Sequence, residues 1–258
     1  MKSFQFIYTL IFLTSICTVT KTKAQNAIFL THGRIEYERK MNLWAQLDDV
    51  EWLSEDESAK DFFKKINPQF KTTYFNLDFN GDKTLFQPGR DNPANNKTMG
   101  WDGPGETNTV FNDLAKSLTT SQKNVYEEKF LLQDSIRKIQ WKITDEKRII
   151  AGFECRRANA IIMDSIYVVA FYTDAITTIG GPESFTGLPG MILGIALPHE
   201  HITWFATKVY TENITDANLV PPTKGKKVNN EQLLKTLKDQ MPTWDKKVAN
   251  RNIRAAMI

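Results

Sequence analysis

The sequence predicts a mainly β protein of the α+β class, with a curved antiparallel β-meander that forms an open half-barrel-like sheet and short flanking helices at 54–66 and 230–241. Short alternating segments follow one another at hairpin spacing in the middle of the chain. Helical patterns are confined to the two ends and do not alternate with strands as they do in parallel α/β folds. The chain has 258 residues, 41% of them hydrophobic, which favours one domain with a substantial core.

Residues 1–24 have the pattern of a secretory signal peptide. Lys2 precedes an apolar run from Phe4 to Cys17, and Thr22-Lys23-Ala24 provides a small-x-small end before Gln25. The alternatives are an N-terminal anchor helix, or a lipid on Cys17, where Ile16 replaces the small residue that lipidation favours. We expect cleavage near Ala24–Gln25, export to the periplasm or the outer surface, and no membrane span after cleavage.

The charge of the mature chain argues against a nucleic-acid partner. The formal net charge is +3, and residues 1–24 carry three lysines and no acid, so the mature chain is formally neutral. Residues 223–254 still hold nine basic and three acidic residues. We therefore expect one domain over 25–222 and a solvated, basic helical tail over 223–258, with anionic lipid or an acidic protein as the alternative role of the tail.

The N-terminal part of the mature chain predicts a strand, a helix, a hairpin and a loop. Residues 33–45 alternate like a half-buried strand, with Ile35, Tyr37 and Arg39 on one face. Ser54 and Glu57 have capping-box spacing, so a helix is expected there with an apolar stripe at Phe62, Phe63 and Ile66.

The hairpin is expected over 74–86, with a type I′ turn at Asn80-Gly81. Residues 87–107 form a long loop that contains Trp101, a candidate contact aromatic.

From 126 to 172 the pattern is one of repeated strands. Turns are expected at residues 145–147 and at Asp164-Ser165. Ile149 and Phe153 share a parity with Cys155, so this cysteine, the only one left after cleavage, is interpreted as a buried apolar residue rather than a reactive thiol. A further strand is expected over 201–210.

Few residues indicate a catalytic activity, and the sequence has no nucleophile elbow, phosphate-binding loop or HExxH motif. His199-Glu200-His201 is the one metal-like spacing, because residues two apart on a strand share a side. A polar turn is the simpler interpretation. The acidic stretch 48–61 lacks the pattern of a calcium loop and is interpreted as a solvated helix face. We expect no cofactor.

Residues 180–190 concentrate glycine and proline in an otherwise regular sheet protein. Glycine permits positive φ and close backbone approach, and proline fixes φ, so this segment predicts a tight, shaped turn. The residues expected to determine its shape are Gly181, Pro182, Phe185, Gly187, Leu188, Pro189 and Gly190.

At this segment the sequence resembles the GLPGLI family of secreted Bacteroidetes proteins. The residues that carry the resemblance are Trp141, Ile143, Lys147, Ile149, Gly152, Phe153, Cys155, Ala158, Phe171, Tyr172, Thr173, Gly181, Pro182, Phe185 and Gly187 to Ile192. Met191 replaces the family's leucine, which is a volume-similar change. The resemblance implies an envelope protein of uncharacterised function, with no catalytic residues to carry over. The hairpin pattern also looks like that of periplasmic lipoprotein carriers.

We therefore predict a non-catalytic binding or accessory protein of the cell envelope. Its curved sheet would present a concave apolar face to a lipid, a peptide or an outer-membrane transport complex, with Trp101 and Trp204 as candidate contacts. The alternative is a metal-binding protein or hydrolase that uses His199, Glu200 and His201. A structural subunit of an envelope complex is a third possibility.

Overall fold

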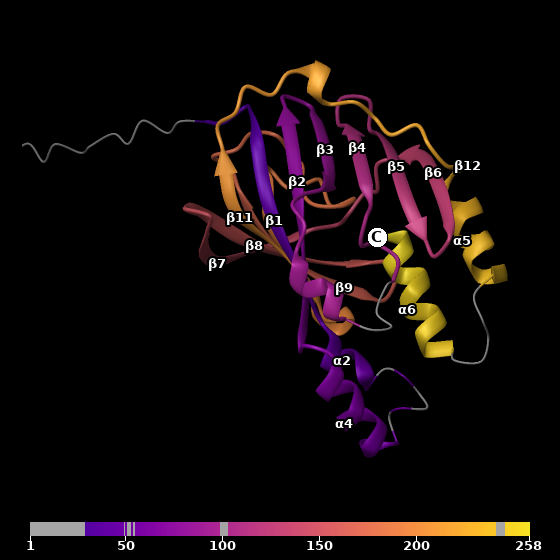
Figure 1. Ribbon diagram of the computed structural model, residues 1–258. Coiled ribbons are helices and arrows are strands. Elements are labelled where there is room, and N and C mark those ends of the chain that lie inside the picture. Colours follow the sequence, from indigo (N-terminus) through magenta and orange to yellow (C-terminus); the bar gives the residue numbers. More distant parts are fainter. Residues whose placement is uncertain (1–28, 49, 51–52, 54, 99–102, 241–245) are drawn as a thin grey trace, which may run out of the picture.

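A single 12-stranded sheet organises the protein (Figure 1). The computed structural model describes residues 29–48, 50, 53, 55–98, 103–240 and 246–258, so the predicted signal peptide lies outside the described residues. The prediction of a mainly β fold with an open sheet is confirmed. The strand order is β12-β6-β5-β4-β3-β2-β1-β11-β10-β9-β8-β7, and the one parallel pair among the described strands is β12 with β6.

The sheet consists of two meanders that meet at its centre. The first meander steps outward from β1 through successive antiparallel pairs, and helices α2 (Leu43–Leu47) and α4 (Glu57–Ile66) lie in the connection from β1 to β2. It comprises β1 (His32–Asn42), β2 (Phe70–Asn80), β3 (Lys83–Pro88), β4 (Thr109–Asp113), β5 (Leu118–Val125) and β6 (Glu128–Ser135). The second starts at the opposite edge and steps inward, and it comprises β7 (Lys142–Ile150), β8 (Phe153–Ile162), β9 (Ile166–Thr173), β10 (Met191–Leu197) and β11 (Ile202–Tyr210). Strand β11 then pairs with β1 and joins the two halves.

One large apolar core is shared by both meanders. In Figure 1 strands β7, β8 and β9 run across and behind the first meander. Ile35 and Tyr37 of β1 are buried as their alternation predicted, and they belong to the same cluster as Val168 of β9 and Ile195 of β10. The Tyr37 hydroxyl crosses this core and donates a hydrogen bond to the Ile192 carbonyl oxygen at 2.6 Å.

The predicted hairpin between β2 and β3 is confirmed, but its turn is displaced by one residue. Asn80 pairs with Lys83, so the two central residues are Gly81 and Asp82. Of these two, Gly81 has positive φ (+56°), and Asn80 remains in the strand. Glycine at the first central position, with positive φ there, is the pattern of a type II′ turn rather than the expected type I′.

The turn expected at residues 145–147 is wrong, because β7 continues through it. The β7–β8 turn lies at Ala151 and Gly152, both with positive φ. The register of β7 against β8 shifts by two residues between Ile143 and Lys147, and the two-residue turn then pairs Ile150, not Ile149, with Phe153. As a result Ile150 is buried and Ile149 is exposed, contrary to the expected parity.

The first helical region also differs in detail from the prediction. Helix α2 (Leu43–Leu47) follows β1 directly, and α4 (Glu57–Ile66) begins after Asp56, whose side chain accepts a hydrogen bond from the Ala59 amide. Asp56 is therefore the N-cap, and the expected Ser54 lies outside the described residues. Phe62 is 59% exposed, so the expected apolar stripe is incomplete.

The C-terminal tail packs on the sheet instead of extending into solvent. Helix α5 (Asn230–Gln240) matches the predicted span, and α6 (Lys246–Met257) follows it. Leu233 and Leu237 of α5 and Met257 of α6 form a second apolar core with Val125 and Phe130 of β5 and β6. The expected solvated tail is therefore wrong, because it carries an apolar face that closes the β6 side of the sheet. None of the described helices is long and apolar enough to cross a membrane.

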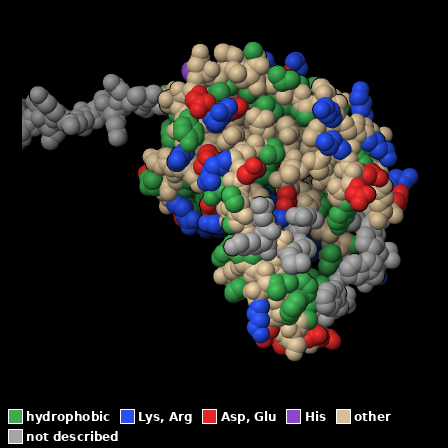
Figure 2. All heavy atoms as spheres, in the orientation of Figure 1, with side chains coloured by type: hydrophobic (Ala, Val, Ile, Leu, Met, Phe, Trp, Pro, Cys, Tyr) green, Lys and Arg blue, Asp and Glu red, His purple; other side chains and the backbone are tan. Residues whose placement is uncertain are grey.

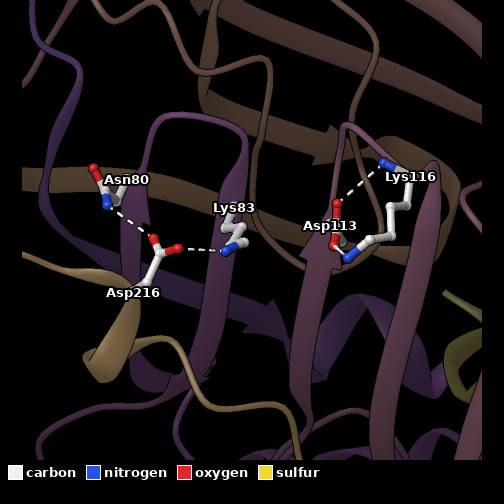
Figure 3. Close-up of polar contacts among 5 residues, drawn as sticks. All are labelled: Asn80, Lys83, Asp113, Lys116 and Asp216. Carbon is white, nitrogen blue, oxygen red and sulfur yellow. Dashed lines mark hydrogen bonds and ion pairs between the residues drawn. The ribbon is translucent and has the colours of Figure 1, made fainter.

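A long connection returns the chain from β11 to the other edge, passing over the ends of the first meander (Figure 1). It contains the 3-10 turn Asp216–Asn218 and leads into β12 (Lys226–Val228). Asp216 accepts hydrogen bonds from Asn80 and Lys83 of the β2–β3 hairpin, and Asp113 binds Lys116 in the next hairpin (Figure 3). Basic side chains gather over this end of the sheet in Figure 2.

Candidate functional site

The glycine- and proline-rich segment 180–190 has the defined shape that the sequence predicted. Gly187 and Gly190 have φ values of +90° and +140°, and a Cβ atom on Gly190 would lie 2.1 Å from the Thr173 carbonyl oxygen. The Trp141 indole nitrogen donates a hydrogen bond to the Thr186 carbonyl oxygen at 2.9 Å. Backbone conformation and close contact together hold this segment in one arrangement.

This segment fills the concave face that was expected to be open. Phe185 and Leu188 of this segment, and Ile176 shortly before it, are at most 1% exposed and belong to the core shared by both meanders. Pro182 is buried as well, whereas Gly187 and Pro189 are exposed. The expectation of an apolar concave face free for a ligand is therefore wrong, because the protein covers that face with its own residues.

Beside the filled core lies a group of buried charges that we call the charged interior: Arg39, Lys123 and Glu183. Arg39 is on β1, Lys123 on β5 and Glu183 in the 180–190 segment, and each is at most 4% exposed. Arg39 follows Ile35 and Tyr37 on the inward face of β1, and Lys123 lies on the inward face of β5 between Ser121 and Val125. Strand alternation thus places both cations inside.

Neighbouring polar side chains form hydrogen bonds with only some of the polar atoms of the charged interior. The Asn108 side-chain nitrogen donates a hydrogen bond to Glu183 Oε2 at 3.0 Å, and nearby Lys71 and Glu106 form a buried ion pair at 2.7 Å. The Arg39 guanidinium lies over the Trp204 ring, 5.5 Å from its centre. Within the part of the chain that the structure describes, Arg39 Nε and Nη1, Lys123 Nζ and Glu183 Oε1 have no hydrogen-bond partner.

Burial shifts the pKa of each of the three groups in the direction that favours its uncharged form. It lowers the pKa of Lys123 to about 8, although Glu183 opposes the shift and Arg137 adds to it. It raises the pKa of Glu183 against the opposing effects of Lys123, Asn108 and Arg39. It also lowers the pKa of Arg39. Desolvation therefore outweighs attraction within this group, as expected for charges that do not touch.

A second candidate site is an open groove, which we call the helix groove, between the C-terminal helices and the 135–138 and 163–165 segments. Its volume is about 670 Å³. Its apolar lining consists of Ile136, Met163, Leu234, Ile253 and Met257. Among the described lining residues, four are basic and one is acidic: Arg137, Lys138, Lys238 and Arg254 against Asp164.

The candidate metal residues lie next to this groove. A smaller polar pocket of about 350 Å³ is lined by Ser165, His199, Glu200, His201 and Arg254, and it shares Ser165 and Arg254 with the helix groove. Glu200 is buried and forms an ion pair with Arg254 at 2.8 Å.

The two histidines lie in a polar turn, in agreement with the simpler interpretation, and not on the strand that a shared metal ion would require. Pro198–Glu200 is a 3-10 turn, and His201 caps it with a φ of +57°. The argument that strand geometry turns both imidazoles to one side is therefore wrong. Over the described residues, no group of three or more His, Cys, Asp and Glu side chains is placed to hold a metal ion.

The remaining predicted residues are placed as follows. Trp101 lies outside the described residues. Trp204 is buried, and its ring packs 6.4 Å from that of Phe185, so it contacts the interior rather than the surface. Cys155 is buried, and burial raises the pKa of its thiol to about 12, in agreement with the interpretation as an apolar residue.

The sequence analysis missed Lys123, Glu183 and the helix groove. The inward parity of Arg39 on its strand was a usable signal for a buried cation. Glu183 carried no such signal, because it lies in an irregular segment whose fold depends on distant strands. The groove depends on the docking of α5 and α6, which no local pattern encodes.

Comparisons with known proteins assign no activity. Residues 161–194, from the end of β8 to β10, match a family described as "Protein of unknown function (Porph_ging)". No curated protein matches the chain. Among solved structures it is similar to PNGF-II in the P21 space group (TM-score 0.49, 18% identity, 77% of this chain and 32% of that chain) and in the C2 space group (TM-score 0.48, 15% identity, 77% and 31%). The chain thus spans about a third of the length of these structures.

Proposed function

We propose that the protein is a non-catalytic binding protein that holds an anionic amphiphile, a molecule with an apolar chain and an acidic head group, in the helix groove. The observation that carries this proposal is the combination of an apolar lining with four basic residues and one acid. Arg254 is already paired with Glu200, so Arg137, Lys138 and Lys238 form the basic rim that would meet an acidic head group. The volume of about 670 Å³ lies within the range of about 300–1,000 Å³ that is typical of small-molecule sites. An uncharged apolar ligand would make no use of the basic rim.

The two parts of the groove would perform different tasks. Leu234 and Ile253 are partly exposed in the groove, so an apolar chain that covers them removes hydrophobic surface from water. Lys238 is exposed at the rim and Arg137 is partly buried there, so an acidic head group would meet charge near both. Apolar burial would supply most of the affinity, and the charges would select the sign of the head group.

We also infer that the protein acts in the cell envelope and belongs to the GLPGLI type. The pattern of residues 1–24 supports export, and the motif over 181–192 supports the family. Intact mass spectrometry of the protein isolated from its native envelope checks the first inference. The mature chain should begin at Gln25, and a retained N-terminus would contradict cleavage.

Binding of dodecanoate by the purified mature chain, measured by isothermal titration calorimetry, tests the proposed function. We expect saturable binding, no binding of dodecyltrimethylammonium, and a loss of about tenfold or more in affinity for Leu234→Glu, which places a like charge in the apolar lining. Lys238→Glu at the rim should weaken binding several-fold.

Lys235→Glu is the matched control, because Lys235 is an exposed lysine of the same helix that does not line the groove. It should leave the dissociation constant unchanged. Equal losses for Lys235→Glu and Lys238→Glu would show a general charge effect and reject the site. Failure of wild-type protein to bind dodecanoate would reject the proposal itself.

A further inference from the structure

The charged interior contains hydrogen-bond donors and acceptors that the described residues leave without partners. Arg39, Lys123 and Glu183 are each at least nine-tenths buried, and in the described part of the chain four of their nitrogen and oxygen atoms lack a hydrogen-bond partner. Most buried polar atoms in folded proteins have such a partner, and leaving one without costs about 1–3 kcal/mol. A group of four in one place indicates that a further molecule completes the network.

These residues do not neutralise one another by contact. Glu183 interacts electrostatically with both Lys123 and Arg39. Yet among the described residues none of its oxygens lies within 4.0 Å of a nitrogen of either cation. The three side chains therefore interact without direct contact, and a water molecule or a small ligand between them would complete their hydrogen bonds.

The chemistry of the unpartnered atoms specifies what fits best. Arg39 and Lys123 offer cationic donors and Glu183 an anionic acceptor, so a molecule with both a carboxylate and a hydrogen-bond donor fits them. Glu106, which is paired with Lys71, also acts on Arg39. The planar guanidinium of Arg39 suits the two oxygens of a carboxylate, and Lys123 adds a second cationic donor. Glu183 Oε1, in contrast, can only accept when ionised, so it requires a hydrogen-bond donor on the same ligand.

We propose that Arg39, Lys123 and Glu183 enclose a binding site for a small carboxylic acid that also carries a hydroxyl or amino group, such as an α-hydroxy or α-amino acid. The Arg39 and Lys123 side chains bind the carboxylate, and Glu183 accepts a hydrogen bond from the hydroxyl or ammonium group. Trp204 supports Arg39 from the side, and Asn108 fixes the other oxygen of Glu183. None of the three proposed ligand-binding residues lines the helix groove, so this site is independent of the function proposed above.

Two measurements on the full mature chain test the site. Mass spectrometry of the acid-denatured protein identifies any small acid retained through purification. Thermal unfolding then follows the melting temperature with acetate, L-lactate and glycine at matched ionic strength. At ten times its dissociation constant a bound ligand raises the melting temperature of a chain of this size by about 3–6 °C. We expect such a rise with lactate or glycine and a smaller one with acetate, which offers Glu183 no donor.

Variants separate this site from general salt effects. Lys123→Met should abolish the rise with every probe, and Glu183→Gln should remove the difference between acetate and the other two. Lys129→Met changes an exposed lysine on β6 of the same hairpin and should retain the wild-type response. If no probe shifts the wild-type protein and no small acid is released, or if Lys123→Met responds like wild type, the charged interior holds only water and the proposal is overturned.

Discussion

Two neighbouring regions of the interior are built in opposite ways, although β1 passes through both. Around Ile35 and Tyr37 the interior is apolar, and the one hydroxyl that Tyr37 places there reaches a backbone carbonyl across the core. Two residues further on, Arg39 has the same inward orientation, but two of its guanidinium nitrogens find no partner in the described chain. The same strand thus supplies a satisfied region and an unsatisfied one.

The difference indicates separate roles for the two regions. An apolar interior gains stability from burial and close packing, whereas buried charges that do not contact one another lose hydration, which the described residues restore only in part. The 180–190 segment joins the two regions, because Phe185 enters the apolar core and Glu183 the charged interior. The charged interior therefore lowers the stability of the folded protein, whereas the adjacent apolar core raises it. A binding role for the charged interior would explain why the protein retains it.

The largest expected effect lies in the apolar region. Phe185→Ala should destabilise the protein by about 3–5 kcal/mol, because it removes a fully buried ring and leaves a cavity beside Trp204. Urea unfolding measures the change. Phe62→Ala is the matched control: its ring is 59% exposed on α4, and the change should stay within about 0.5 kcal/mol. Equal effects of the two substitutions would mean that Phe185 is not a core residue.

The sequence allowed good prediction wherever burial follows local alternation. The inward faces of β1 and β9, the β2–β3 hairpin and the span of α5 were all predictable, because a half-buried strand or helix displays its period in its own residues. The shaped turn at 180–190 was also predictable, because glycine and proline restrict the backbone locally. Cys155 is buried as interpreted, although Ile149, which was expected to share its face, is exposed.

Features that depend on distant partners were not predictable. The register shift within β7, which lets the strand run on to Ile150, depends on its pairing with β8. The filling of the concave face depends on residues 174–190 returning over strands that lie about a hundred residues earlier, as the hydrogen bond from Thr178 to the Gly81 carbonyl oxygen illustrates. Glu183 becomes a buried charge only through this return, so no local pattern could identify it.

A smaller change in the free energy of unfolding is expected in the charged interior, where a substitution should stabilise the protein, in contrast to Phe185→Ala. Lys123→Met should stabilise ligand-free protein at pH 7 by up to about 3 kcal/mol, because the folded state holds Lys123 with a pKa of about 8 against 10.5 in the unfolded chain. A depressed folded-state pKa means that wild type is penalised fully below pH 8 and recovers stability as the pH rises from about 8 to 10.5. The advantage of the variant should therefore shrink across that window.

Urea unfolding at pH 7 and pH 10 measures this advantage, with both proteins refolded from urea so that any retained ligand is removed. Groups that do not interact with Lys123 titrate equally in both proteins, so the difference reports on Lys123 together with its electrostatic partners Glu183 and Arg137. Lys129→Met makes the same substitution at an exposed position and should show no advantage at either pH. If Lys123→Met instead destabilises the protein at pH 7, Lys123 contributes to folding through a favourable contact. The charged interior would then resemble the apolar core in function, and the contrast between the two regions would fail.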